Sequence, residues 1–316
     1  MDPHEQASSR TLENAYAYFE GRFVPLLEAK ISIMTHAFLY GSAIFEGIRG
    51  YYNSEQDDVY ILRLVDHYTR MKNNGRILMM EMEQTAQQLA DLTVELVRKC
   101  GYREDIYIRP MAYKSAQRIG LKWDQQHEFL AFAVPMGSYL TKERSLNLMV
   151  SSWRRIQDNA IPPRAKVSGS YVNVSLAAAE AREGGFDEGI LLNEDGTVSE
   201  AAGMNIFIVR SGTLITTPVY DNVLEGITRA AVFEIARELK ISCEERSINR
   251  SELYSCDEVF LCGTGAEISG AGFIDRRKIG NGETGPVTKK IQDVYFPAVR
   301  GNIPRYKKWL TPVWNR

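Results

Sequence analysis

The sequence predicts two domains that each combine α-helices with a largely antiparallel β-sheet. First, 316 residues is a usual length for two domains or for one large domain. Second, helical and strand-like segments are mixed, but without the regular alternation that builds a parallel sheet. Third, the segment 135–141 contains Pro and Gly between two strand-like runs. We therefore expect an N-terminal domain at 1–136, a linker at 137–142 and a C-terminal domain at 143–316.

The N-terminal domain is expected to begin with a β-hairpin, because 15–32 alternates apolar and polar residues around Glu20-Gly21. Asp66 is placed to cap a helix that runs to about Asn73. In Gln84–Cys100 leucines and a valine recur at steps of three and four, and Gly101 follows as a helix stop. Further strands are expected at 58–64, 105–113 and 128–136.

The C-terminal domain contains the clearest amphipathic helix of the sequence, at 226–241, which Thr228 can cap. A second helix is expected near Val174–Arg182, ended by Gly184-Gly185, and Asp195-Gly196 predicts a tight turn. Strands are expected at 146–153 and 188–193, and 258–268 is expected to be a buried strand that enters a glycine turn. A two-residue hairpin is expected to join 205–210 to 213–217.

Composition excludes several classes of protein. The formal net charge is -2, from 38 basic and 40 acidic side chains, so the chain lacks the excess of positive charge typical of proteins that bind nucleic acid or an acidic membrane surface. No apolar run approaches the roughly 20 residues of a membrane helix. The polar N-terminus lacks a hydrophobic signal region. The four cysteines show no C-x-x-C spacing. These features favour a cytoplasmic protein with free thiols.

The motifs of several common enzyme classes are absent from the sequence. None of the four histidines forms an H-x-x-x-H pair, so no metal site is expected. There is no G-x-S-x-G elbow, no G-x-x-x-x-G-K-[ST] loop and no G-x-G-x-x-G after a strand. Serine hydrolysis, ATP use and nicotinamide chemistry are therefore disfavoured.

Three sites remain that could carry chemistry. Gly226-Ile227-Thr228 at a helix start can bind an anion, or it can be an ordinary capped helix. Lys166, preceded by two prolines and followed by small residues, can form a Schiff base or can be a surface lysine. Glu200 can pair with a cofactor ring nitrogen or can be a turn glutamate. Taken alone, each site is better explained by the structural role.

Read in order, seven segments resemble the branched-chain amino acid aminotransferases, which belong to the fold-type IV pyridoxal-phosphate enzymes. The resemblance covers roughly 15–300, and every segment keeps the family order. It implies a small N-terminal α/β domain and a larger C-terminal pseudo-barrel domain that carries the cofactor lysine. The segments are "YGSAIFEGIRGY", "LVDHYTRM", "YIRP", "RAKVSGSYVN", "EGILLNEDGTVSEAAGMNIF", "LEGITR" and "CGTGAEI".

The resemblance implies pyridoxal 5'-phosphate as the cofactor. Lys166 would form the internal aldimine and then move the proton between the substrate Cα and the cofactor. Glu200 would bind the pyridine nitrogen and keep it protonated. Tyr171 would bind the ring hydroxyl. The phosphate would be held by Arg70 and by the helix start, and the cofactor contacts would be Lys166, Arg70, Tyr171, Glu200, Ile227, Thr228 and Thr264.

The resemblance also implies a substrate pocket that takes both an aliphatic side chain and the second carboxylate of glutamate. Arg109 and Tyr40 would bind that carboxylate, while Thr264 and Gly265 would bind the α-carboxylate through backbone N–H groups. The lining residues of the pocket would be Tyr40, Phe45, Gly47 and Tyr139. Gly265 and Met136 depart from residues common among relatives, which could broaden the substrate range.

The expected reaction is ping-pong transfer of the amino group from Leu, Ile or Val to 2-oxoglutarate. The expected partners are small amino acids and 2-oxo acids. A homodimer, or an assembly of dimers, is implied, with a loop near Arg118–Leu121 reaching the partner's active site. The alternatives are a fold-type IV transaminase for D-amino acids or (R)-amines, a lyase resembling aminodeoxychorismate lyase, and a non-enzymatic relative. A set of Lys166, Tyr171, Glu200 and Arg70 argues against the last.

Overall fold

A computed structural model describes residues 15–137 and 144–315. The chain forms two compact units, and neither is a single stretch of sequence. Unit 1 consists of Met1–Tyr139, Ala165–Gly169 and Pro297–Arg316, and unit 2 consists of Leu140–Arg164 and Ser170–Phe296. The sequence predicted a single boundary between the domains, the linker at 137–142. Because most of that segment lies outside the described residues, the linker stays a prediction, and the return of two later segments to unit 1 was not foreseen.

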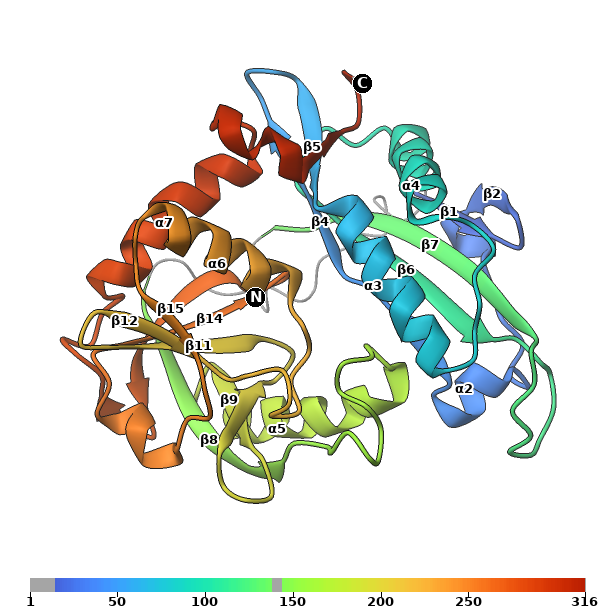
Figure 1. The fold of residues 1–316 in the computed structure, drawn as a ribbon. Coiled ribbons are helices and arrows are strands. Elements are labelled where there is room, and N and C mark those ends of the chain that lie inside the picture. The colour runs from blue at the N-terminus through green and yellow to red at the C-terminus, as the bar shows by residue number, and fades with distance from the viewer. Residues whose placement is uncertain (1–14, 138–143, 316) are drawn as a thin grey trace. The chain divides into compact units, whose positions relative to one another are not determined.

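Unit 1 is built on an eight-stranded sheet in which every pairing is antiparallel. Helices α3 (Leu64–Ile77) and α4 (Ala86–Cys100) pack against each other and against this sheet (Figure 1). The path runs β17-β5-β4-β6-β7-β1-β2, and β3 pairs with β6. The strands are β1 (Tyr16–Phe19), β2 (Arg22–Pro25), β3 (Ala43–Phe45), β4 (Ile48–Asn53), β5 (Asp58–Leu62), β6 (Ile106–Lys114), β7 (His127–Pro135) and β17 (Leu310–Pro312).

The predicted helix signals of unit 1 are met at α4 and fail in part at α3. At α4, Gly101 ends the helix in the left-handed conformation as predicted, while the reciprocal capping box of Thr85 and Gln88 had no sequence prediction. At α3, Asp66 does not cap. The helix begins at Leu64 behind Arg63, so Asp66 lies within the first turn, where its charge favours the helix dipole. The predicted hairpin at Glu20-Gly21 is confirmed by the pairing of β1 with β2.

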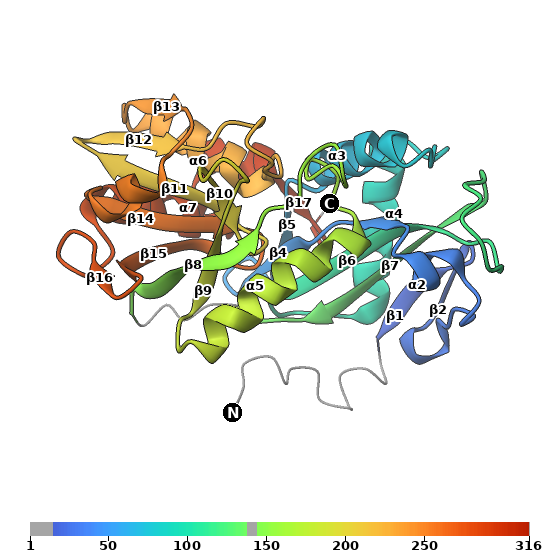
Figure 2. The ribbon, with the colours of Figure 1, turned by 90° about the horizontal axis from the view of Figure 1, so that it is seen from below.

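Unit 2 contains a nine-stranded sheet in which strand β8 (Leu146–Arg154) is parallel to both neighbours. Parallel neighbours need a crossover, and helix α5 (Tyr171–Glu183) supplies it between β8 and β9 (Glu188–Leu192) (Figure 2). A Cβ on Gly189 of β9 would lie 2.8 Å from the carbonyl oxygen of Ala177 in α5, so this glycine allows the close packing of helix and strand.

The remaining pairings of the sheet in unit 2 are antiparallel, except for β12 with β13. Ser211-Gly212 forms the predicted two-residue hairpin between β11 and β12. The path is β10-β9-β8-β15-β14-β11-β12-β13, with β16 on β15. These strands are β10 (Val198–Ala201), β11 (Asn205–Arg210), β12 (Thr213–Thr216), β13 (Cys243–Glu245), β14 (Glu258–Gly263), β15 (Glu267–Ile274) and β16 (Arg277–Lys278).

Helix α6 (Ile227–Glu238) occupies the segment of the strongest predicted helix, but Thr228 is not its cap. Gly226 is the N-cap, and Thr228 is a buried residue of the first turn. Several later elements had no sequence prediction, among them α7 (Pro286–Val299), the 3₁₀ helix η4 (Pro304–Trp309) and β17. The short elements η1 (Leu26–Glu28), α2 (His36–Tyr40), η2 (Ser168–Ser170) and η3 (Arg250–Tyr254) complete the described fold.

Besides the pairing of β17 with β5, a buried carboxylate holds the C-terminal segment in unit 1. Asp58 accepts backbone N–H groups from Val313, Trp314 and Asn315 at 2.8–3.0 Å. Hydrogen bonds from backbone donors offset the cost of burying its charge. Within the described ranges, no helix combines the length and the apolar character needed to cross a membrane.

Candidate active site

Lys166 lies in unit 1, on a short segment that pairs with β3. The Phe45 N–H donates to the Lys166 carbonyl at 3.1 Å, and Ile44 forms an antiparallel bridge with Val167. The same segment also comes close to Gly41: the Gly169 N–H donates to the Gly41 carbonyl at 3.1 Å, and both residues at this contact are glycines. The Lys166 Nζ lies 4.9 Å from the centroid of the Phe45 ring. The backbone therefore fixes this half-buried lysine on both sides.

Arg70 is paired with Glu46, a residue to which the sequence analysis gave no role. The Arg70 Nε and Nη2 atoms lie 2.8 and 2.6 Å from the two carboxylate oxygens. His67, one turn before Arg70 on α3, places its Nδ1 2.8 Å from the same carboxylate. Burial alone would raise the pKa of Glu46, but Arg70 and His67 lower it to about 2. Glu46 is therefore ionised.

Burial lowers the pKa of His67, although the hydrogen bond to Glu46 opposes that effect. The positive charges of Arg70 and Lys166 lower the pKa further. His67 is therefore neutral near pH 7 and donates its Nδ1 hydrogen to the carboxylate. Of the groups around Glu46, Arg70 carries the positive charge.

Arg109, Phe45 and Tyr107 form a cluster of one cation and two aromatic rings. The Arg109 guanidinium carbon lies 4.3 Å from the Phe45 ring centroid and 5.2 Å from that of Tyr107. Its Nη2 donates to the Tyr107 hydroxyl at 2.7 Å, and its buried Nε has no partner among the described residues. A Cβ on Gly47 would clash with the Tyr107 hydroxyl, so a larger residue there would require this ring to move.

Tyr40 is held by the loop that was expected to reach a partner subunit. Its hydroxyl accepts the Gly120 N–H at 3.0 Å. The loop itself is braced by an ion pair of 2.7 Å between Arg118 and Asp124. It is also held by the Trp123 Nε1, which donates to the Leu78 carbonyl at 2.8 Å. Tyr40 and the loop therefore form one ordered structure in unit 1.

Glu200 lies in unit 2, on β10, and only 2% of its surface is exposed. Arg155 places Nη2 2.7 Å from one carboxylate oxygen. The other oxygen accepts the Asn205 Nδ2 at 2.9 Å and the Leu224 N–H at 3.3 Å. A buried carboxylate held by an arginine and two N–H donors keeps a fixed position and a negative charge. Sequence reasoning had assigned no role to Arg155 or Asn205.

Asn205 also connects Glu200 to the start of α6. Its Nδ2 donates to the Leu224 carbonyl at 2.9 Å, and a Cβ on Gly226 would lie 2.0 Å from its Oδ1. Among the described residues no side chain caps this helix start, so the first N–H groups of α6, from Ile227 onward, can bind an anion. Thr228, which is 3% exposed, adds a hydroxyl in the same turn.

The other predicted site residues of unit 2 lie at the ends of elements. Gly263 pairs with Glu267, so Thr264 and Gly265 form part of the short turn between β14 and β15. Tyr171 is the first residue of α5 and packs on a small core cluster with Val174, Ala177 and Leu191. Tyr139 lies outside the described residues.

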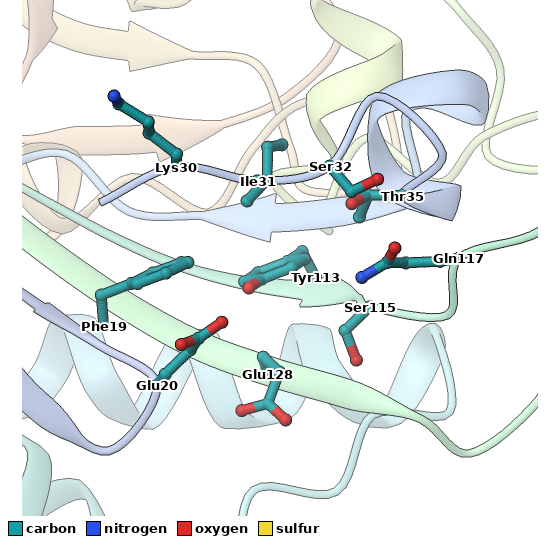
Figure 3. A pocket seen from close by; sticks show the side chains of 10 residues that line it. All are labelled: Phe19, Glu20, Lys30, Ile31, Ser32, Thr35, Tyr113, Ser115, Gln117 and Glu128. Atoms are coloured by element: carbon teal, nitrogen blue, oxygen red, sulfur yellow. The ribbon is translucent and has the colours of Figure 1, made fainter. Parts of the chain in front are cut away.

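Unit 1 also has a polar cavity of about 410 Å³ at the β1–β7 side of its sheet (Figure 3). None of the predicted site residues that the structure describes lines it. Its wall combines polar groups with one aromatic face on each of two strands, and the lining residues are Phe19, Glu20, Lys30, Ile31, Ser32, Thr35, Tyr113, Ser115, Gln117 and Glu128.

Comparison with known proteins identifies the class of this chain. Residues 43–271 match the family model for amino-transferase class IV. That is well over half of the sequence, so the chain belongs to the class IV aminotransferases. The two-unit architecture with antiparallel and mixed sheets is the fold-type IV architecture that the seven sequence segments predicted, and the resemblance is confirmed.

Within this class, the chain is similar over nearly its full length to branched-chain aminotransferases. A probable branched-chain-amino-acid aminotransferase of Aquifex aeolicus is 52% identical over 303 residues, which is 95% of this chain and 97% of that protein. The branched-chain-amino-acid aminotransferase of Escherichia coli K12 is 36% identical, with 94% and 97% covered. Among solved structures, the branched-chain aminotransferase of Thermoproteus uzoniensis with norvaline is 43% identical with a TM-score of 0.91, covering 95% of this chain and 99% of that one.

A further structure carries a derivative of the expected cofactor. It is a branched-chain amino acid aminotransferase of T.th., complexed with N-(5'-phosphopyridoxyl)-L-glutamate, and it is 40% identical to this chain. Its TM-score is 0.88, and the alignment covers 94% of this chain and 98% of that one.

Proposed function

We propose that this chain is a pyridoxal 5'-phosphate enzyme that transfers the amino group of Leu, Ile or Val to 2-oxoglutarate. The products are the 2-oxo acid and L-glutamate. Relatives bearing the name branched-chain-amino-acid aminotransferase, similar over nearly the full chain, support this assignment. The structure with a phosphopyridoxyl-glutamate adduct supports both the cofactor and glutamate as one of the two amino donors.

The residues present fit this cofactor. A phosphate needs fixed donors: in unit 1, Arg70 would offer its oriented guanidinium, and in unit 2, the start of α6 would offer the backbone N–H groups of Ile227 and Thr228. A protonated pyridine nitrogen needs a buried anion, and Glu200 is one. Tyr171 would donate to the ring hydroxyl, and Thr264 would contribute to both phosphate and substrate binding.

Pyridoxal phosphate, when bound, supplies an aldehyde that condenses with amines and a ring that accepts the electron pair of a broken Cα–H bond. Lys166 would hold the aldehyde carbon through its Nζ until the amino donor displaces it. The freed Nζ would take the proton from the substrate Cα and return it to the carbon that came from the aldehyde, after which water would release the 2-oxo acid. Glu200 would keep the pyridine nitrogen protonated. 2-Oxoglutarate then takes up the amino group by the reverse sequence.

The observation that carries the substrate assignment is the Arg109 cluster of unit 1. A pocket for both leucine and glutamate must present an apolar wall and a cation to the same side-chain position. The Arg109 guanidinium carbon lies 4.3 Å from the centroid of the Phe45 ring, and the Lys166 Nζ lies 4.9 Å from the same centroid. The rings can cover an aliphatic side chain, and the guanidinium can bind a carboxylate. Gly265 would leave the α-carboxylate site open.

The first experiment measures absorbance of the cofactor-loaded protein after separate mixing with L-leucine, D-alanine and an (R)-arylamine. Loss of the visible cofactor band with L-leucine alone is expected. Comparable conversion by D-alanine or the amine would instead indicate a stereochemically switched or broadened transaminase. Release of pyruvate from an aminodeoxychorismate-type substrate without an oxo acid would indicate a lyase. Lys166→Ala should abolish turnover, whereas Lys290→Ala, an exposed lysine on α7, should not.

A second experiment tests dual recognition. Arg109→Leu should raise KM for 2-oxoglutarate by about 10- to 100-fold, since an arginine–carboxylate pair is worth roughly 1.5–3 kcal/mol. It should change the L-leucine half-reaction much less. Arg103→Leu is the matched control, because Arg103 also lies on an aromatic ring, 4.2 Å from Trp314, but at an exposed site in the same unit. Equal loss in both half-reactions would count against a carboxylate-binding role.

We also infer a homodimer and a cytoplasmic location. Unit 1 exposes several large apolar side chains on the segment before and within α2 and on the braced loop, which are Ile33, Phe38, Ile119 and Leu121 at 64–79% exposure. Such side chains are typical of a surface covered by another chain. Light scattering after size exclusion should give a mass of twice 35.8 kDa or a multiple. All four cysteines carry free thiols, as expected in a reducing compartment.

A further inference from the structure

We infer that Glu46 is a positioning residue, which orients the Arg70 guanidinium for the cofactor phosphate with His67 as its second support. This inference rests on the proposed function, because it presumes that Arg70 binds a phosphate. It adds to that function two residues whose side chains need not touch the cofactor.

The geometry restricts Arg70 to one orientation. Both the Nε and the Nη2 atoms donate to Glu46, one to each carboxylate oxygen, at 2.8 and 2.6 Å. A two-point contact between a planar guanidinium and a planar carboxylate fixes the plane and the direction of the arginine side chain. The Nη1 edge takes no part in this two-point contact and is therefore held pointing away from Glu46. Arg70 alone, on a helix surface, would sample several rotamers.

Glu46 is in turn fixed by its own surroundings. It directly follows β3, its N–H donates to the Pro110 carbonyl at 2.9 Å, and its side chain is fully buried. Neutral His67 donates to the oxygen that also accepts the Arg70 Nη2. His67 and Arg70 lie one turn apart on α3, so the helix presents both side chains to the carboxylate.

A purely stabilising role does not explain this cluster. Burying an ion pair costs several kcal/mol of desolvation for each ion, so apolar residues of similar volume would stabilise the same position at least as well. What an apolar residue cannot do is hold an arginine in a fixed direction while leaving it charged. The positive charge of Lys166 acts on His67, so the cluster is electrostatically coupled to the segment that carries the reactive lysine.

The experiment measures the affinity of the apo-protein for pyridoxal phosphate and for pyridoxal, which lacks the phosphate. Glu46→Gln should weaken pyridoxal phosphate binding by about 10- to 100-fold, the usual effect of a lost hydrogen bond to a charged group. Pyridoxal binding should change by less than about 3-fold. The ratio of the two dissociation constants isolates the phosphate contribution. Glu46→Asp, which restores the charge, should recover part of the loss.

The control is Asp58→Asn, which also removes a fully buried carboxylate from unit 1 but binds the C-terminal backbone. It should lower thermal stability and leave the ratio unchanged. If Glu46→Gln does not fold, His67→Asn tests the same idea, with an expected phosphate-specific loss of about 3- to 10-fold. Equal weakening of both ligands, or of neither, would overturn the inference. Failure of the wild type to bind pyridoxal phosphate would instead overturn the proposed function.

Discussion

The close approach of Gly41 and Gly169 makes a quantitative prediction about the segment that carries Lys166. An alanine Cβ at position 41 would lie 2.7 Å from the Gly169 Cα and 3.2 Å from its nitrogen. Carbon atoms in contact prefer 3.5–4.0 Å, so the two backbones would have to separate by roughly 1 Å. Gly101 is a matched control, because it also ends a helix with positive φ but has no atom within 4 Å of the added Cβ.

Gly101→Ala should therefore cost only the left-handed strain, about 1–2 kcal/mol. Gly41→Ala should cost that strain plus about 1–3 kcal/mol for the forced separation. Because 1 kcal/mol lowers the melting temperature of a domain this size by roughly 2–4 °C, the two variants should differ by several degrees. The measurement is thermal unfolding followed by circular dichroism.

A second readout follows from the position of Gly169, three residues after Lys166. Gly41→Ala should reduce the fraction of chains that form the visible cofactor band at limiting pyridoxal phosphate, while Gly101→Ala should not. Equal melting temperatures for the two variants would refute the claim that the Gly41–Gly169 contact is tight. A normal cofactor band in Gly41→Ala would refute its link to the lysine.

Three further predictions concern stability and reactivity. Burial raises the pKa of Glu188 to about 7, so its stabilising contribution is present below its usual value of 4.5 and is lost as the pH rises through 7. Glu188→Gln should therefore be more stable than wild type at pH 8, by up to roughly 3 kcal/mol, but not at pH 4; parallel melting curves at both pH values would contradict this. Asp58→Asn should lower the melting temperature and expose the C-terminal segment to carboxypeptidase, since three backbone donors lose an ionised acceptor. With a thiol reagent, exposed Cys243 should react in the native state, whereas Cys256 and Cys262, whose pKa burial raises to about 12, should react only on unfolding.

The sequence by itself determined the class of protein and most of the local structure. Local signals act over a few residues, so the stop at Gly101 and the hairpin at Ser211-Gly212 were readable directly. The seven ordered segments identified the family, because many short matches in one order are far more specific than any one of them. Helix starts were less certain: Asp66 and Thr228 have the chemistry of a cap but lie inside the first turn.

Tertiary structure decided which side chains act together. Glu46 and Arg70 are 24 positions apart, and Arg155 and Glu200 are 45 apart, so no periodic pattern could have paired them. The return of Ala165–Gly169 and of the C-terminal segment to unit 1 likewise depends on long-range contacts, with β3 and with Asp58. A buried charge is recognised only once burial is known, because its pKa and its partner are set by what surrounds it and not by its neighbours in sequence.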